Sequence, residues 1–206
     1  LQIITDFAKT HDQIRVYQNK KNLGVAKTRN RGFELASGKY IALLDGDDIW
    51  EPDKLQKQIA LLEKTGCDFC YASYSYINST GIEISSAHVV PESCAFFDLL
   101  KENFICCSSV VLKKELIKRH KMSSDYFHED FVFWLELLQN GYKACGCTQS
   151  LVKYRISKHG RSYNKLSAAK NRWLVYRNYL KLPFFTSLYY FYAYTVNGLK
   201  KYRKLK

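Results

Sequence analysis

The chain has 206 residues, of which 47% are hydrophobic and 25% charged, and this balance excludes a disordered or fibrous protein. The length suits one α/β-sized domain with an appendage. The net charge of +13 is local, because residues 150–206 hold fourteen of the 32 Lys and Arg residues and no Asp or Glu. We therefore expect a nearly neutral body with a cationic C-terminal tail.

Hydrophobic periodicity and the positions of Gly and Pro predict alternating strands and helices, which favours an open, mainly parallel sheet. The apolar run 40–44 is typical of a strand buried on both faces of such a sheet. In the helix that follows Pro52, we expect Leu55, Ile59 and Leu62 on the buried face. The predicted strands are 14–18, 40–44, 68–78, 108–112 and 143–155; the predicted helices are 1–8, 25–36, 52–66, 96–102, 113–120, 129–139 and one after Tyr163 that Pro183 breaks; residues 79–95 are expected to form a loop.

The seven cysteines do not have the number or spacing of a disulfide framework. Cys67 and Cys70 form one C-x-x-C pair, but Cys145 and Cys147 form C-x-C, whereas a structural zinc site usually needs two well-spaced pairs. We therefore expect buried, reduced cysteines, which point to the cytosol. No uninterrupted apolar stretch of the sequence reaches the roughly 20 residues that span a bilayer.

An acidic turn, Asp45-Gly46-Asp47-Asp48, directly follows the predicted strand 40–44. In an open α/β sheet, ligands bind at the carboxyl ends of the strands. Carboxylates there can hold Mg²⁺ or Mn²⁺ together with substrate phosphates. The alternative is a surface turn without a ligand, because Asp-Gly is also a strong turn signal.

The surroundings of this turn are more specific. The run NLGVAKTRNRGFELASGKYIALLDGDDIWEPDKL contains N-x-G-x-x-x-x-R-N-x-G, a G-K-Y-I strand, the D-x-D-D turn and a P-D-x-L helix. Downstream, HEDFVFWLEL looks like an E-D-x-x-x-W-L helix, and Tyr154-Arg155 looks like the end of the next strand. Together these motifs resemble the inverting nucleotide-sugar glycosyltransferases of family 2, which have the GT-A fold. The resemblance covers nearly all of residues 1–160.

The resemblance implies a role for each matched residue. Asp47 would coordinate the divalent ion, Mg²⁺ or Mn²⁺, that bridges the donor diphosphate. Asp45 would lie by the ribose or sugar of the donor, and Arg29 would reach the nucleotide. Asp130 would be the general base that takes the proton of the acceptor hydroxyl, with Glu129 as its neighbour or substitute.

A structural interpretation of Glu129 and Asp130 stays open beside this one. Acids in the first turn of a helix interact favourably with the helix dipole, whatever their chemistry. The dipole would also lower the pKa of Asp130 and weaken it as a base, unless an apolar wall such as Phe131 or Trp134 restores its basicity. His159, after the Y-R strand, is expected to be a solvated loop residue rather than a ligand of the metal or diphosphate.

Members of this family begin with a strand–helix–strand unit that holds the nucleotide base, and little of it is found here. We therefore expect residues 1–160 to form an N-terminally incomplete GT-A domain and residues 161–206 a basic, aromatic, helical appendage. Within it, residues 184–196 are rich in Tyr and Phe, and LKKYRKLK follows. Consecutive aromatics beside Lys and Arg favour an interfacial helix on a membrane surface over nucleic-acid binding, and packing as ordinary core is a third possibility.

The sequence thus predicts a metal-dependent inverting glycosyltransferase that uses a nucleotide-sugar, expected to be a UDP-sugar. Its acceptor would be a glycan or lipid-linked glycan in cell-surface polysaccharide synthesis. We expect a cytoplasmic protein, peripheral at the inner face of the cell membrane through residues 184–206, with no nucleic-acid partner. The rival hypothesis is a truncated, non-catalytic remnant that binds membranes or partners through this tail.

Overall fold

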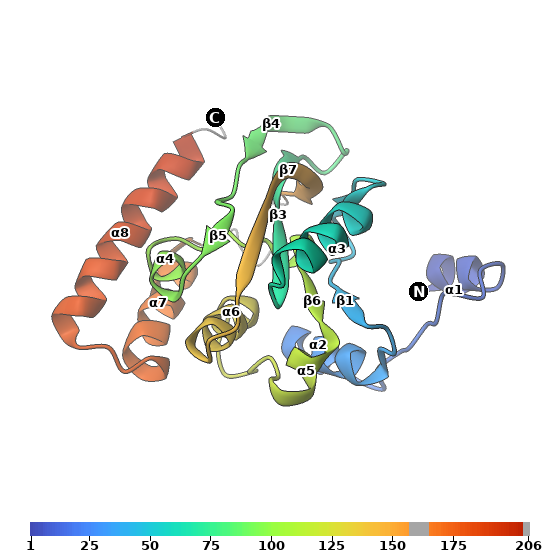
Figure 1. Ribbon diagram of the computed structural model, residues 1–206, viewed down its shortest axis with the longest axis horizontal. Coiled ribbons are helices and arrows are strands. Elements are labelled where there is room, and N and C mark those ends of the chain that lie inside the picture. The colour runs from blue at the N-terminus through green and yellow to red at the C-terminus, as the bar shows by residue number, and fades with distance from the viewer. Residues whose placement is uncertain (157–164, 204–206) are drawn as a thin grey trace.

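A computed structural model describes residues 1–156 and 165–203 of the chain, and Figure 1 shows one mixed sheet with helices on both sides. The helices are α1 (Gln2–Ala8), α2 (Val25–Leu35), α3 (Lys54–Thr65), α4 (Phe96–Lys101), α5 (Lys114–Arg119), α6 (Glu129–Gln139), α7 (Lys165–Leu174) and α8 (Phe184–Arg203), with a 3₁₀ turn at Cys107–Ser109 and a π-helical turn at Val175–Tyr179. The strands are β1 (Tyr40–Ala42), β2 (Ile49–Trp50), β3 (Phe69–Ile77), β4 (Glu83–His88), β5 (Ser93–Cys94), β6 (Val111–Lys113) and β7 (Ala144–Arg155).

The sheet has the order β1-β6-β3-β7-β2, with β4 paired to β3 and β5 paired to β7. β3 and β7 run parallel at its centre, and every other pairing in the described chain is antiparallel. The expectation of a mainly parallel sheet is therefore wrong: the sheet is mixed, and most of its described pairings are antiparallel. The apolar run 40–44 forms a short strand that pairs antiparallel with β6, and apolarity alone does not report the direction of a neighbour.

Two further expectations are corrected. Residues 14–18 form no strand, because they lie along the surface without a pairing partner among the described residues. Residues 79–95 contain β4 and β5, which extend the sheet from β3 and β7. The other predicted helices and strands are present with boundaries shifted by a few residues, and α6 spans residues 129–139 as expected.

Every residue of β3 is buried, because helices cover both faces of the sheet. On one face, α3 packs over a small core that contains Leu62, Cys70 and Cys145. On the other face, α2, α4 and α6 cover the main core, in which Phe33 contacts Phe133 and Phe69 stacks on Trp134. The predicted Cys pairs lie around the smaller core as free thiols, and no group of metal-ligating side chains is found in the described chain.

The buried face of α3 differs from the predicted one. Leu62 is buried and Ile59 packs against the same core as expected, but Leu55 is 40% exposed, whereas Lys54 and Gln58 are fully buried. Lys54 places its Nζ atom 4.1 Å from the ring centroid of Trp50. Gln58 donates a hydrogen bond of 2.9 Å to the carbonyl of Ser109. Polar residues thus support the 3₁₀ turn beneath the helix, and a hydrophobic pattern does not reveal them.

A register shift lies in the middle of the β3–β7 pair. The pairing changes at Ser73, so that the seven residues 70–76 lie opposite the ten residues 145–154. Before the shift, Phe69 and Tyr71 belong to the main core; after it, Tyr74 and Tyr76 do. The irregularity therefore brings the later tyrosines of β3 to the same side as the earlier aromatic residues.

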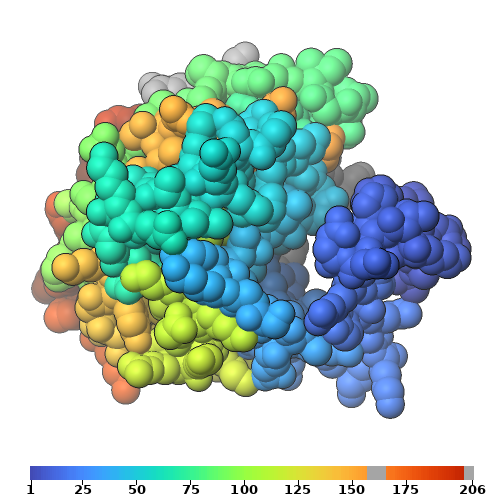
Figure 2. Space-filling view, turned by 45° about the vertical axis from the view of Figure 1, so that its right-hand side comes forward, coloured from blue at the N-terminus to red at the C-terminus, as the bar shows by residue number. Residues whose placement is uncertain are grey.

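The two ends of the chain differ in how they contact the body. In α1, no residue is buried, and Figure 2 shows this helix standing apart from the rest of the molecule. By contrast, α8 packs along α4 and α7, where Trp173 contacts Phe191 and Ser187 is fully buried. The expected division of the chain between residues 160 and 161 lies outside the described residues.

Candidate active site

The acidic turn lies between β1 and β2, and a buried serine of the 3₁₀ turn holds it in place. The backbone N–H of Asp45 donates to Ser108 Oγ (3.0 Å), and this hydroxyl donates to Asp48 Oδ2 (2.5 Å). The other oxygen of Asp48 accepts the backbone N–H of Arg155 (2.9 Å). Burial raises the pKa of the Asp48 carboxyl to about 6. Asp48 therefore anchors the turn to β7 and to the 3₁₀ turn.

Arg29, on α2, joins the turn to the start of α6. Its guanidinium donates to Asp45 Oδ1 (2.5 Å) and to Glu129 Oε1 (2.9 Å), and the Arg29 side chain is 14% exposed. Both bonds connect residues far apart in the sequence. Charge-assisted bonds of this kind are among the stronger polar contacts in a protein, so Arg29 fixes the distance between the two acidic segments.

The two acids at the start of α6 have different surroundings. Glu129 is buried and ion-paired to Arg29, whereas Asp130 Oδ1 accepts the backbone N–H of Phe131 (2.8 Å). Burial, together with the neighbouring charge of Glu129, raises the pKa of Asp130. Of the two alternatives that the sequence left open, this direction matches the one in which desolvation of the carboxylate restores its basicity.

A cavity of about 700 Å³ opens beside these groups. It brings together all five residues to which the sequence assigned a role, and they come from three separate segments of the chain. They are Arg29, Asp45, Asp47, Glu129 and Asp130. Their chemical roles stay predictions, but their convergence on one cavity from positions up to 101 residues apart is what a shared site requires.

Asp47 presents its carboxylate to this cavity. In the described part of the chain no partner binds that carboxylate, although Arg155 Nε donates to the backbone carbonyl of Asp47 (2.7 Å). Asp45 and Asp48, by contrast, have partners for their carboxylates. The residues therefore fit a hard divalent cation held by one carboxylate, with phosphate oxygens and water completing the coordination.

Sequence reasoning missed several residues of this site. Ser108 was part of a predicted strand, and nothing in its motif indicates a contact with the acidic turn. Arg155 was matched to the family without a role, yet its Nη1 donates to the carbonyls of Asn78 and Ser79. Tyr74, Tyr76 and Tyr154 line the cavity with ring centroids 5.5–6.1 Å apart. His159 lies outside the described residues.

The C-terminal helices form the far wall of the same cavity, through residues that the sequence assigned to a separate appendage. They are Leu166, Ala168, Ala169, Arg172, Tyr194, Thr195, Gly198, Leu199 and Lys201. In the portion of the protein that the structure covers, no helix has both the length and the apolar character needed to cross a membrane.

Comparison with known proteins identifies the family of this chain. The family model described as glycosyl transferase family 2 matches residues 1–121. A putative teichuronic acid biosynthesis glycosyltransferase, TuaG of Bacillus subtilis, is 34% identical over 97% of this chain and 79% of its own length. The Escherichia coli UDP-Glc:α-D-GlcNAc-diphosphoundecaprenol β-1,3-glucosyltransferase WfgD is 35% identical over 92% of this chain and 74% of its own length.

Two solved structures share the fold at low sequence identity. The first is Staphylococcus aureus TarS 1-349 in complex with UDP-GlcNAc, with a TM-score of 0.63, 14% identity and coverage of 86% of this chain and 52% of that one. The second is the mannosyltransferase PcManGT of Pyrobaculum calidifontis with GDP-Man and Mn²⁺, with a TM-score of 0.63, 15% identity and coverage of 88% and 51%. The chain spans about half the length of these two structures. It has the GT-A fold and belongs to glycosyl transferase family 2.

Proposed function

We propose that this chain transfers a sugar from a nucleotide-sugar to a hydroxyl of a glycan acceptor, with inversion at the transferred carbon. The observation that carries the proposal is the pair of bonds from Arg29, which hold the acidic turn and the α6 acids around one cavity. A group that binds the leaving diphosphate and a base on the opposite side of the sugar are the two parts that in-line displacement needs.

The acidic turn binds the donor in this proposal. Asp47 would hold Mg²⁺ or Mn²⁺, Asp45 would lie by the ribose or sugar, and Arg29 would orient Asp45 toward the nucleotide. The ion, when bound, neutralises the charge that develops on the leaving diphosphate. Support for a divalent ion comes from PcManGT, which shares the fold and was solved with GDP-Man and Mn²⁺.

Asp130, rather than Glu129, acts as the general base. The salt bridge to Arg29 already occupies the carboxylate of Glu129. The Asp130 carboxyl has a pKa raised by burial, which makes its carboxylate a stronger proton acceptor than an exposed one. Glu129 then acts as a positioning residue, because its negative charge next to Asp130 contributes to the raised pKa.

The relatives indicate the substrate class. WfgD is named for UDP-Glc and a GlcNAc-diphosphoundecaprenol acceptor, and TuaG is named for teichuronic acid biosynthesis. We therefore propose a UDP-sugar donor and a lipid-linked glycan acceptor in the synthesis of a cell-surface polysaccharide. Such an acceptor is presented at the cytoplasmic face of the cell membrane, which is the location we propose for this chain.

The test of the site is calorimetric titration of the 206-residue chain with UDP, GDP and dTDP, each with and without Mn²⁺. We expect one nucleotide to bind in a Mn²⁺-dependent manner, and the Asp47→Asn variant to lose most of the Mn²⁺-dependent part of the affinity. Asp12→Asn, which removes an exposed acid outside the cavity, is the matched control. Equal Mn²⁺ dependence in the Asp47→Asn variant and the wild type would overturn the metal assignment.

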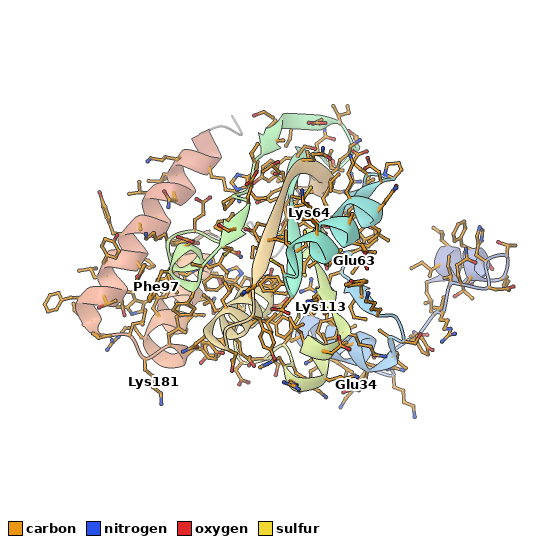
Figure 3. All side chains as sticks on the ribbon, in the orientation of Figure 1. Glu34, Glu63, Lys64, Phe97, Lys113 and Lys181 are labelled. Atoms are coloured by element: carbon orange, nitrogen blue, oxygen red, sulfur yellow. The ribbon has the colours of Figure 1, made fainter. Side chains whose placement is uncertain are left out.

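The outer side of α8 is the surface that we propose contacts the membrane. Four of its apolar residues are 48–81% exposed, with spacings close to one helical face: Phe185, Leu188, Tyr189 and Tyr192. Basic residues lie at both ends of this stripe, and Figure 3 shows Lys181 projecting away from the body at the bend before α8. An apolar stripe between cationic ends suits the surface of an anionic bilayer.

Co-sedimentation with vesicles of phosphatidylcholine and phosphatidylglycerol tests this contact. Replacing Phe185 and Tyr192 together by Ser should lower vesicle binding about tenfold, because two exposed aromatic groups leave the interface. A double variant of α1, Ile3→Ser with Phe7→Ser, removes similarly exposed apolar groups from another helix and should bind as the wild type does. Equal binding by both double variants would exclude α8 as the contact.

A further inference from the structure

Arg172 of α7 is a buried charge with incomplete hydrogen bonding. Its side chain lines the cavity of the proposed site, yet the residue is only 3% exposed. The guanidinium lies over two rings, with Cζ 3.4 Å from the centroid of Phe131 and 4.7 Å from that of Tyr194. Among the residues that the structure describes, Nε and Nη1 find no hydrogen-bond partner. Buried polar groups in folded proteins nearly always have partners, so these two atoms need an explanation.

The other two arginines of the cavity differ from Arg172. Arg29 is ion-paired with Asp45 and Glu129. Arg155 donates to three backbone carbonyls. Both are held by the protein itself, whereas Arg172 is held by ring stacking, which satisfies none of its N–H donors. Arg172 is therefore the cavity arginine whose donors suit a ligand.

Acidic and basic groups from different elements line the cavity. What we call the acidic end comprises Asp45 and Asp47, which follow β1, and Asp130 of α6, whereas Arg172 and Lys201 belong to the wall formed by α7 and α8. Three mutually contacting tyrosines, Tyr74, Tyr76 and Tyr154, also line it. Tyr154 lies next to Arg155 at the acidic turn, and Lys201 Nζ donates to Tyr74 Oη (2.8 Å). Arg172 stacks on Phe131, the residue that follows Asp130, so an anion at Arg172 would lie on the side of the site that holds the proposed base.

We propose that Arg172 binds a phosphate-type anion, and that this anion is the phosphate or diphosphate group of the acceptor. Guanidinium groups match the oxygens of phosphate esters, and a buried cation gains most from an anionic partner. The donor diphosphate is the other source of the same chemistry, but the proposed metal ligand for it lies at the acidic end. This inference rests on the proposed function and assigns the orientation of its acceptor.

The test measures binding of farnesyl diphosphate and of farnesol to the full chain, with the preferred nucleotide and Mn²⁺ present at saturation. In the wild type, the diphosphate should bind at least tenfold more tightly than the alcohol. Arg172→Gln should weaken diphosphate binding by about tenfold and leave farnesol and nucleotide affinities unchanged. Lys170→Gln removes an exposed charge from the same helix and should change none of the three.

Four results would overturn the inference. Equal wild-type affinity for the diphosphate and the alcohol would do so without any variant, even if Arg172→Gln did not fold. Unchanged diphosphate binding in Arg172→Gln would do so as well. An equal loss of farnesol affinity would assign Arg172 to packing, and a loss of nucleotide affinity would assign it to the donor. If no nucleotide binds to the wild type, the proposed function itself fails, which is a separate outcome.

Discussion

The two ends of the cavity are built in different ways. At the acidic end, Arg29, Ser108 and the backbone of Arg155 bind the carboxylates, so that charges from distant segments hold one another in place. At the other end, aromatic rings hold Arg172 and two of its donors have no partner within the described chain. The protein's own groups satisfy the acidic end, whereas at Arg172, on our proposal, a ligand would supply the missing partners.

The largest effect is expected at Asp130. Asp130→Asn should lower sugar transfer about a thousandfold, because an amide cannot accept the proton, while nucleotide binding is kept. Glu129→Gln retains Asp130 and should lower transfer far less. Measuring initial transfer rates for both variants checks which acid is the base; similar losses in the two would refute the assignment to Asp130.

The same Asp130→Asn variant should be more stable than the wild type at neutral pH. Because the pKa of Asp130 is raised in the folded chain, the folded state binds this proton more tightly than the unfolded state does. The ionised Asp130 carboxylate therefore destabilises the folded state. This destabilisation is absent below the unfolded pKa of about 3.9 and complete above the folded pKa. We expect a gain of ~2–4 °C in Tm at pH 7 that disappears near the unfolded pKa.

Arg29 is expected to have the next largest effect, and mainly on stability. Arg29→Met removes the partner of two carboxylates, of which Glu129 is buried, and should cost about 3–5 kcal/mol in the free energy of unfolding. Lys27→Met, an exposed cation on the same helix, should cost less than about 0.5 kcal/mol. Urea unfolding of both variants measures the difference. Equal losses would mean that the acidic end is not held by Arg29.

Ser108 should have the smallest effect of the three. Ser108→Ala leaves Asp48 Oδ2 and the backbone N–H of Asp45 without their partner and should cost about 1–3 kcal/mol, with weaker nucleotide binding. Ser109→Ala removes a neighbouring buried hydroxyl that bonds to Cys106 instead. It should cost a similar amount and leave nucleotide affinity intact. Equal losses of affinity would contradict a specific role of Ser108 in the turn.

The acidic end could be predicted from the sequence because its residues lie in contiguous motifs. The turn at Asp45–Asp48, the pair Glu129–Asp130 and the helix around Arg29 are each short, and the structure brings them to one cavity. Helix α6 was also predictable, because seven of its eleven residues are buried and a stop signal follows it. The pairing of Arg29 with Glu129, 100 residues apart, leaves no local signal.

The wall formed by α7 and α8 could not be predicted, because it too depends on contacts between distant segments of the chain. The sequence around Arg172 is basic and is typical of an exposed helix. Only the packing of α7 and α8 against α6 buries Arg172. The tail was expected to be an appendage, but its helices line the cavity. The direction of β1 and the strands within 79–95 were missed because strand pairing depends on partners elsewhere in the chain.

The register shift between β3 and β7 restricts how the length of this chain can change. The stretch of β7 exceeds its partner by an odd number of residues, ten against seven. Since side chains alternate between faces, inserting or deleting a single residue at 148–150 would turn Tyr154 away from Tyr74 and Tyr76. Changes of two residues preserve the alternation. Natural length variation at this position should therefore occur in steps of two, whereas the exposed turn around residues 79–82 should accept any length.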